Sequence, residues 1–234
     1  MGGDRTRGKD GDGGVRVFMA LPAPEVADLE PFDRCLADVV RVLGLAVARE
    51  PGTDDRLWGH RVRAALREAC EQEDAFPAEA FEVLLRAAVH DPNPSFNRWF
   101  VEAALNAFGR GRVRSRLTDY LRTGTDPERA GAARAWYWTA LPLDHPHLRP
   151  TDPAGNGPEA NNASVGVRDW NQAALREFVT NEHLDVRRCI LPGLPLRPSA
   201  YPAELHDLVE EAIAVARSHP DDYLRHRVEH QVRD

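Results

Sequence analysis

The sequence predicts an all-α fold, a right-handed α-α superhelix of about five helical pairs with one long loop inserted. Apolar residues recur at spacings of three and four along most of the chain, which is the period of a helix buried on one side. An acidic residue followed by arginine also returns at a nearly constant interval, as in a stacked helical repeat. No stretch shows the sustained two-residue alternation that is typical of a strand.

The composition is that of a globular protein and excludes several classes. The chain has 234 residues, of which 42% are hydrophobic and 29% charged. These values fit a single domain with its own core over residues 15–234. No apolar run approaches the roughly 18 residues of a membrane-spanning helix. The net charge of −7 disfavours nucleic acid and anionic membranes as partners, because neutralising phosphates requires a basic surplus.

The N-terminus and the cysteines bear on the compartment. Residues 1–14 are rich in Gly, Asp and Arg, so we expect a disordered tail without a secretory signal. Cys35, Cys70 and Cys189 lack the spacing of a disulfide framework or a zinc site. We therefore expect a cytoplasmic protein with reduced thiols. The 29 arginines against one lysine indicate GC-rich, bacterial-like coding.

The repeat is marked by acidic residues that stand just ahead of Arg-bearing helices. The intervals between successive markers are 36, 35, 59 and 37 residues, so three of the four agree. The long interval contains an insertion at about residues 141–167, which is rich in Pro, Asn, Gly and Asp and lacks helical periodicity. The five markers are Asp55, Asp91, Asp126, Asp185 and Asp222.

The helices follow from their apolar stripes, taken in chain order. The first helix lies within residues 15–49, with Phe32, Leu36, Val39 and Leu43 on one side. The second helices of the pairs follow the markers, with stripes that include Trp58, Val62 and Leu66; Phe100, Ala104 and Phe108; Ala130, Ala133 and Tyr137; Val186 and Ile190; and Leu224 and Val228. The first helices stand between them, with stripes that include Phe81, Leu84 and Leu85; Val113, Leu117 and Leu121; Trp170, Ala174 and Phe178; and Leu205, Val209 and Ala212.

These stripes predict at least eight helices in antiparallel pairs. The acidic markers predict helix starts near Asp55, Asp126, Asp185 and Asp222.

The pattern D-x-x-R or D-x-x-x-R ahead of an Ala-rich helix, seen from Asp126 to Arg129 and after Asp185, resembles the HEAT repeat family, including its shorter bilin-lyase-like variety. The likeness covers about residues 53–233 apart from the insertion. It implies a ladder of Asp and Arg along the stack, and a fold rather than an activity. The implied ladder consists of Asp55, Asp91, Arg98, Asp126, Arg129, Asp185, Arg187, Asp222 and Arg225.

The ladder has a physical rationale at each second helix. An aspartate at the helix start accepts hydrogen bonds from free backbone N–H groups and faces the positive end of the helix dipole. The arginine then reaches an aspartate of a neighbouring unit. We expect the Asp126 side chain to accept from N–H groups near Glu128 or Arg129, with Pro127 at the first helical position.

An aromatic cluster is the main candidate for binding. Residues 136–138 are consecutive aromatics, and at about 100° per residue they cannot all face one core stripe. The side chains either lean into a groove, where aromatic and Arg side chains form binding hot spots, or cover the apolar side beneath the insertion. The candidate partner- or ligand-binding residues are Trp99, Arg134, Trp136, Trp138, Asp144, His145 and His147.

Metal-like patterns have simpler interpretations. His226 to His230 fit H-x-x-E-H, but no further carboxylate ligand follows well downstream. The segment from Asp91 to Glu102 imitates a calcium loop, but Phe96 stands where such a loop needs glycine. We therefore predict no metal and no cofactor.

Three functions remain open. The first is a protein-interaction scaffold that binds a partner protein or peptide on the concave face, supported by the repeats and the lack of a catalytic motif. The second is an enzyme whose pocket, covered by the 141–167 loop, takes a small apolar or aromatic ligand. The third is a HEAT-like DNA-binding or glycosylase protein, which the acidic charge disfavours. No catalytic residue is identified.

Overall fold

The computed structural model describes residues 19–22, 30–49, 54–145, 147–148 and 162–232. This part of the chain forms helices and no strand, which confirms the all-α prediction. The predicted tail at residues 1–14 lies outside the described residues, as does most of the insertion. No helix within the described ranges is both long and apolar enough to cross a lipid bilayer.

Ten α-helices follow one another in these ranges. The helix starts expected near Asp55, Asp126, Asp185 and Asp222 are confirmed to within one residue. The α-helices are α1 (Glu30–Leu43), α2 (Asp55–Gln72), α3 (Ala80–His90), α4 (Arg98–Phe108), α5 (Arg110–Thr123), α6 (Asp126–Tyr137), α7 (Val167–Thr180), α8 (Leu184–Ile190), α9 (His206–Ser218) and α10 (Asp222–Val232). Short 3-10 helices are η1 (Trp138–Ala140), η3 (Leu191–Gly193), η4 (Pro198–Ala200) and η5 (Ala203–Leu205).

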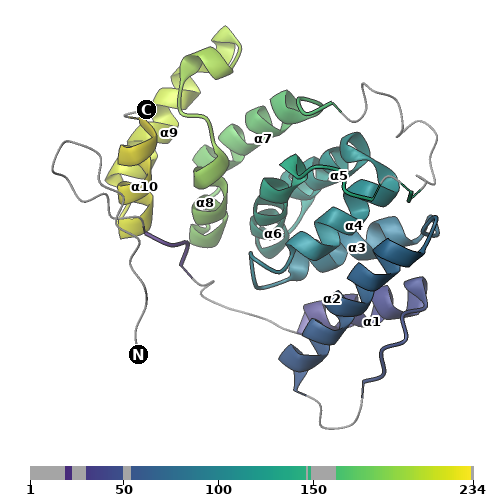
Figure 1. The fold of residues 1–234 in the computed structure, drawn as a ribbon. Coiled ribbons are helices and arrows are strands. Elements are labelled where there is room, and N and C mark those ends of the chain that lie inside the picture. Colours follow the sequence, from purple (N-terminus) through teal and green to yellow (C-terminus); the bar gives the residue numbers. More distant parts are fainter. Residues whose placement is uncertain (1–18, 23–29, 50–53, 146, 149–161, 233–234) are drawn as a thin grey trace, which may run out of the picture.

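Consecutive helices contact each other in five pairs, and the pairs follow one another along an arc from α1 and α2 to α9 and α10 (Figure 1). Contacts between pairs run in two rows. One row is α1, α3, α6, α8 and α10, and the other is α2, α4, α5, α7 and α9.

The chain changes rows at its second connection between pairs. Helices α4 and α5 belong to the same row and are joined by Gly109 alone, whose positive φ of 82° is accessible to glycine. The second helices of the pairs therefore do not form one continuous row, because α2 and α4 lie in one row and α6, α8 and α10 in the other. A strictly regular stack would keep all second helices in one row, and the chain departs from that pattern here.

Helix α6 lies at the centre of the arrangement and contacts α3, α5 and α8. Five small residues on it are buried, so three neighbouring helices can approach its backbone closely. The approach is closest at Gly131, where a Cβ atom would lie 1.9 Å from the Val89 carbonyl oxygen of α3. The buried residues are Ala130, Gly131, Ala132, Ala133 and Ala135.

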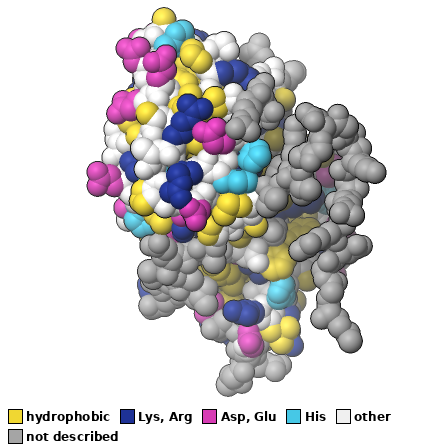
Figure 2. Space-filling model, turned by 90° about the vertical axis from the view of Figure 1, so that its left-hand side faces the viewer, with side chains coloured by type: hydrophobic (Ala, Val, Ile, Leu, Met, Phe, Trp, Pro, Cys, Tyr) yellow, Lys and Arg dark blue, Asp and Glu magenta, His cyan; other side chains and the backbone are white. Residues whose placement is uncertain are grey.

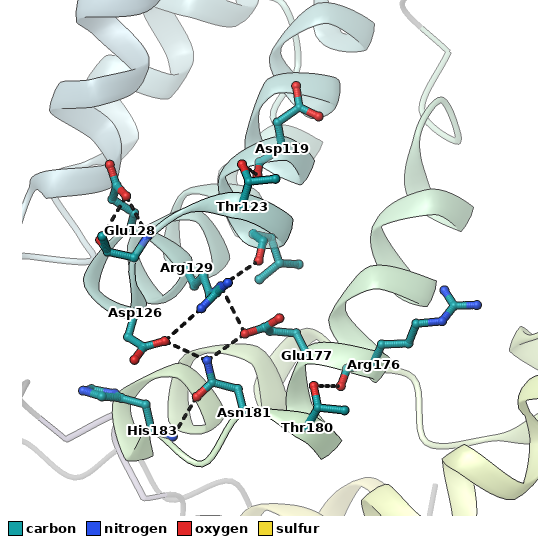
Figure 3. A network of polar contacts seen from close by, with 12 residues as sticks. Asp119, Thr123, Asp126, Glu128, Arg129, Arg176, Glu177, Thr180, Asn181 and His183 are labelled. Carbon is teal, nitrogen blue, oxygen red and sulfur yellow. Dashed lines mark hydrogen bonds and ion pairs between the residues drawn. The ribbon is translucent and has the colours of Figure 1, made fainter.

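The start of α6 corrects the predicted role of Asp126. The N-cap is Thr125, whose N–H and hydroxyl donate to the Glu128 carboxylate at 2.7 and 2.9 Å. Asp126 is the first helical residue and accepts from Arg129 at 3.1 Å and from Asn181 of the next pair at 2.7 Å (Figure 3). Its carboxylate therefore connects two helical pairs instead of capping a helix.

A similar one-residue shift occurs at two other helix starts. Asp54 caps α2 by accepting from the N–H of Arg56 at 2.7 Å, and Asp221 caps α10 by accepting from the N–H of Leu224 at 3.1 Å. The side chain of the predicted Asp55 lies outside what the structure describes. Asp222 instead pairs with Arg225 within its own helix.

The remaining Asp and Arg residues of the predicted ladder also join neighbouring helical pairs. Their hydrogen-bond and ion-pair partners differ from those that the sequence pattern indicated. Arg129 pairs with Glu177 of α7 at 3.2 Å, as Figure 3 shows. Arg187 donates to backbone carbonyls of α7, and the neighbouring Arg188 pairs with Asp185 at 3.5 Å and with Asp221 at 2.7 Å.

Near the N-terminal end the ladder differs again. Asp91 pairs with Arg63 of α2, and Arg98 pairs with Glu102 of its own helix at 3.3 Å.

Two carboxyl groups at the start of α6 predict a junction that weakens in acid. Donation from Asn181 is the main cause that lowers the pKa of Asp126, and Arg129 adds to it. At Glu128 burial acts to raise the pKa, but the hydrogen bonds from Thr125 bring it below its ordinary value. Because both folded pKa values lie below the unfolded ones, this stabilisation is complete above the unfolded values and is lost as the pH falls through the folded ones.

We therefore expect the free energy of unfolding to decrease below about pH 4, near the unfolded values of these groups. The decrease should be smaller in Asp126→Asn, which has one fewer carboxyl group with a lowered pKa. Urea unfolding followed by circular dichroism at a series of pH values measures it. Asp119→Asn, an exposed position on α5, is the control and should follow the wild type. An identical acid response of Asp126→Asn and the wild type contradicts the prediction.

The described ends of the insertion are bound to the helices by two buried arginines. Arg114 donates to the carbonyls of Ala163 at 2.7 Å and Val165 at 2.8 Å, and Arg110 donates to the carbonyl of Leu141 at 2.9 Å. Burial is the main cause that lowers the pKa of Arg114 to about 10, so its guanidinium stays charged at neutral pH. Carbonyl oxygens satisfy this charge and hold the described ends of the insertion against α5.

Candidate functional site

A pocket of about 670 Å³ lies among the N-terminal helices, α6 and α8; we call it the central pocket. Its walls come from α1, α2, the α3–α4 connection, α6 and α8, with Leu21 and Pro22 on one side. Its volume is in the usual range for ligand sites. Its polar and charged lining side chains are Asp33, Arg56, His60, Arg63, Asp91, Asn93, Arg134, Asp185, Arg188 and Cys189.

The α3–α4 connection shapes one wall through its own hydrogen bonds. Asp91 accepts from the N–H of Asn93 at 2.9 Å, and the Asn93 side chain accepts from the N–H of Ser95 at 2.9 Å. The buried Asn97 donates to the carbonyl of Ala88 at 3.4 Å. The residues that imitate a calcium loop in the sequence are thus bonded to the turn itself.

A buried ion pair joins this wall to α2. Arg63 donates to Asp91 at 2.5 Å, and both side chains are almost fully buried. The Arg63 guanidinium also lies 5.1 Å from the ring centre of Phe96 and 5.3 Å from that of Phe32, within cation–π range. Burial raises the pKa of Asp91, and the attraction of Arg63 partly opposes this rise.

Arg134 enters the pocket from α6 without a carboxylate partner. Among the described residues its one hydrogen bond is to Cys189 Sγ at 3.6 Å. Its Nε atom is buried and has no hydrogen-bond partner there. Within the described ranges no ion pair is formed by this guanidinium. Burial raises the pKa of Cys189, so the thiol is neutral at physiological pH and forms no ion pair with Arg134, whose nearest electrostatic effect on a lining carboxylate is a weak attraction to Asp91.

The aromatic candidates diverge and do not line the pocket. Trp136 stacks on Trp170 of α7 with ring centres 4.1 Å apart, and Arg114 lies 5.1 Å from its ring. Trp138 donates to Asn97 Oδ1 at 2.8 Å. Trp136 thus lies beside the arginine that holds the insertion, in keeping with the covering interpretation.

The two remaining aromatic positions lie nearer the surface. Trp99 lies between Arg67 and Arg98, whose guanidinium carbons are 5.9 and 5.8 Å from its ring. Tyr137 is 72% exposed, although the sequence placed it in the core stripe of α6.

The histidines of the insertion lie against α2 and α4. The N–H of His145 donates to Asn106 Oδ1 at 2.9 Å, and His147 Nε2 lies 2.8 Å from the Cys70 carbonyl. Asp144 is exposed. Of the seven predicted binding residues, only Arg134 lines the central pocket.

The C-terminal H-x-x-E-H motif brings its two imidazoles together. His226 Nε2 and His230 Nε2 are 3.1 Å apart, and Glu229 pairs with Arg217. In the residues that the structure covers, no group of three or more His, Cys, Asp or Glu has the geometry to hold a metal ion.

The sequence did not identify Arg63 and His60 as residues of the site. It also did not predict that Asp91 and Cys189 line the same pocket. The one available signal was the marker position of Asp91, which placed this residue at a junction between helices. Comparisons of the chain with models of protein families, curated proteins and solved structures gave no match.

Proposed function

We propose that this chain is a protein-interaction scaffold of the HEAT-repeat type, a right-handed solenoid whose central pocket receives a segment of a partner protein. The observation that carries the proposal is the pocket of about 670 Å³, which has the unpaired guanidinium of Arg134 in its wall. The pocket is built from residues of four helical pairs, α1–α2 to α7–α8, and a surface shared by several repeats is typical of binding by stacked helices.

The two other functions receive less support from the site. None of the described residues of the 141–167 segment lines the central pocket, and those that line a pocket, Val165 and Gly166, belong to a smaller one of about 220 Å³ beside α5. For nucleic acid, Figure 2 shows Arg side chains interspersed with Asp and Glu on the displayed face instead of a continuous basic field. This distribution accords with the net charge of −7 and provides no phosphate track on that face.

Filling the pocket tests the proposal. Gly59 lines the pocket on α2, and a Cβ atom there would meet side-chain atoms and no backbone atom, 3.1 Å from Arg63 and 3.6 Å from Leu36. We expect Gly59→Leu to occupy the pocket and to abolish co-purification of a stoichiometric partner from native extract. Gly193→Leu is the matched control, because no atom lies within 4 Å of a Cβ at that position.

Both variants should retain the helical circular dichroism of the wild type. Retention of the partner by Gly59→Leu, or absence of any partner after gentle cross-linking of the wild type, contradicts the proposed function.

A further inference from the structure

Among the buried and half-buried charges that line the central pocket, all but one form an ion pair in the described part of the chain. Arg63 pairs with Asp91 at 2.5 Å, and Arg188 pairs with Asp185 at 3.5 Å. The third lining carboxylate, Asp33, pairs with Arg49 of the α1–α2 connection at 3.0 Å.

Arg134 is that exception. A half-buried guanidinium has lost part of its hydration, and a thiol acceptor at 3.6 Å returns little of the lost free energy. Arg56 also lines the pocket without an ion pair among the described residues, but it is exposed and its charge is solvated. An anion brought into the pocket would therefore gain most from Arg134.

The surrounding carboxylates limit the charge of that anion. Asp33, Asp91 and Asp185 line the same pocket, so the second negative charge of a phosphate monoester would be opposed by like charges. A carboxylate carries a single charge, and a guanidinium can bind its two oxygens in a bidentate manner. The pocket therefore suits a carboxylate better than a phosphate.

The remaining wall is apolar and accepts a neighbouring side chain of the same ligand. Aromatic rings and prolines cover it on three sequence segments, which favours burial of a large apolar group beside the carboxylate. These residues are Leu21, Pro22, Phe32, Pro92, Pro94 and Phe96.

We propose that the ligand of the central pocket is an acidic peptide segment, in which one carboxylate binds Arg134 and an adjacent large apolar side chain packs on the apolar wall that includes Phe96. This inference rests on the proposed function and specifies the chemistry of the partner. It assigns to Arg134 a direct contact with the ligand.

The test uses N-acetylated tetrapeptide amides that carry Glu-Phe, Gln-Phe or phosphoserine-Phe, titrated into the full chain by calorimetry. We expect the Glu-Phe peptide to bind at least about tenfold more tightly than the Gln-Phe peptide, since a hydrogen bond to a charged group contributes about 1.5–3 kcal/mol. In Arg134→Met this preference should vanish. Arg168→Met, an exposed position on α7, is the control and should retain it.

Three results overturn the inference: equal binding of the Glu and Gln peptides or no binding of either, a Glu preference that survives in Arg134→Met, or tightest binding of the phosphoserine peptide. Salt provides a check on the wild type alone, because the Glu preference should shrink as sodium chloride is raised. If Gly59→Leu loses its partner while the peptides show no Glu preference, the docking site stands and only its acidic specificity fails.

Discussion

Replacing Gly131 by alanine is expected to destabilise the fold by about 3 kcal/mol, the upper part of the usual range for overpacking. The added methyl group would lie 1.9 Å from the carbonyl oxygen of Val89 and 2.8 Å from its carbonyl carbon. Both atoms belong to the backbone of α3, so no side-chain rotation can relieve the clash. Helices α3 and α6 must move apart, and α6 also contacts α5 and α8.

Urea unfolding monitored by circular dichroism measures this effect. Gly59→Ala is the matched control, because Gly59 is also a buried helical glycine, but its added methyl group would meet side-chain atoms instead of backbone atoms. Alanine favours a helix over glycine by about 1 kcal/mol, so the control should be neutral or slightly stabilised. Equal midpoints for the two variants would show that α3 and α6 do not approach as closely as described.

The central helix also shows why the sequence predicted elements better than their orientation. A one-sided stripe defines which face of a helix is buried, and α3 and α4 have such stripes. Helix α6 has small residues around most of its circumference because three helices pack on it. Its stripe was therefore ambiguous, and Tyr137 was placed in the core although it is 72% exposed.

The acidic markers located helix starts but not the capping residue. Two adjacent residues able to cap a helix occur at Asp54-Asp55, Thr125-Asp126 and Asp221-Asp222. In each case the first of the two residues is the N-cap and forms the hydrogen bonds of the cap. The second residue is then the first helical position, where its side chain can pair with an arginine three residues later, as Asp126 does with Arg129. The repeat period alone does not separate these two arrangements.

The candidate site depended on contacts that no local pattern contains. Arg63 and Asp91 are 28 residues apart, and Arg134 and Cys189 are 55 apart. Which helices face each other across the pocket also depends on the change of rows at Gly109. A strict repeat predicts no such change, so the sequence pattern does not indicate that Arg134 and Cys189 lie together.

The second large effect is expected at the buried ion pair of the central pocket. Asp91→Asn should lower the free energy of unfolding by about 3–5 kcal/mol, the range for removing one partner of a buried pair. Arg63 would remain charged and almost fully buried after losing the one ion pair that it forms within the described residues. Glu82→Gln is the control, because Glu82 pairs with Arg116 at the surface and exposed pairs contribute at most about 1 kcal/mol.

The double variant Arg63→Met/Asp91→Leu separates the charge from the packing. With both charges removed, a methionine at position 63 would pack among the rings of Phe32, Phe96 and Phe100, which now surround the guanidinium. Replacing a buried pair by apolar residues is often neutral, so the double variant should recover most of the stability lost in Asp91→Asn. If it unfolds as readily as the single variant, the hydrogen bond from the N–H of Asn93, which asparagine at position 91 can still accept and leucine cannot, contributes as much as the balance of charge.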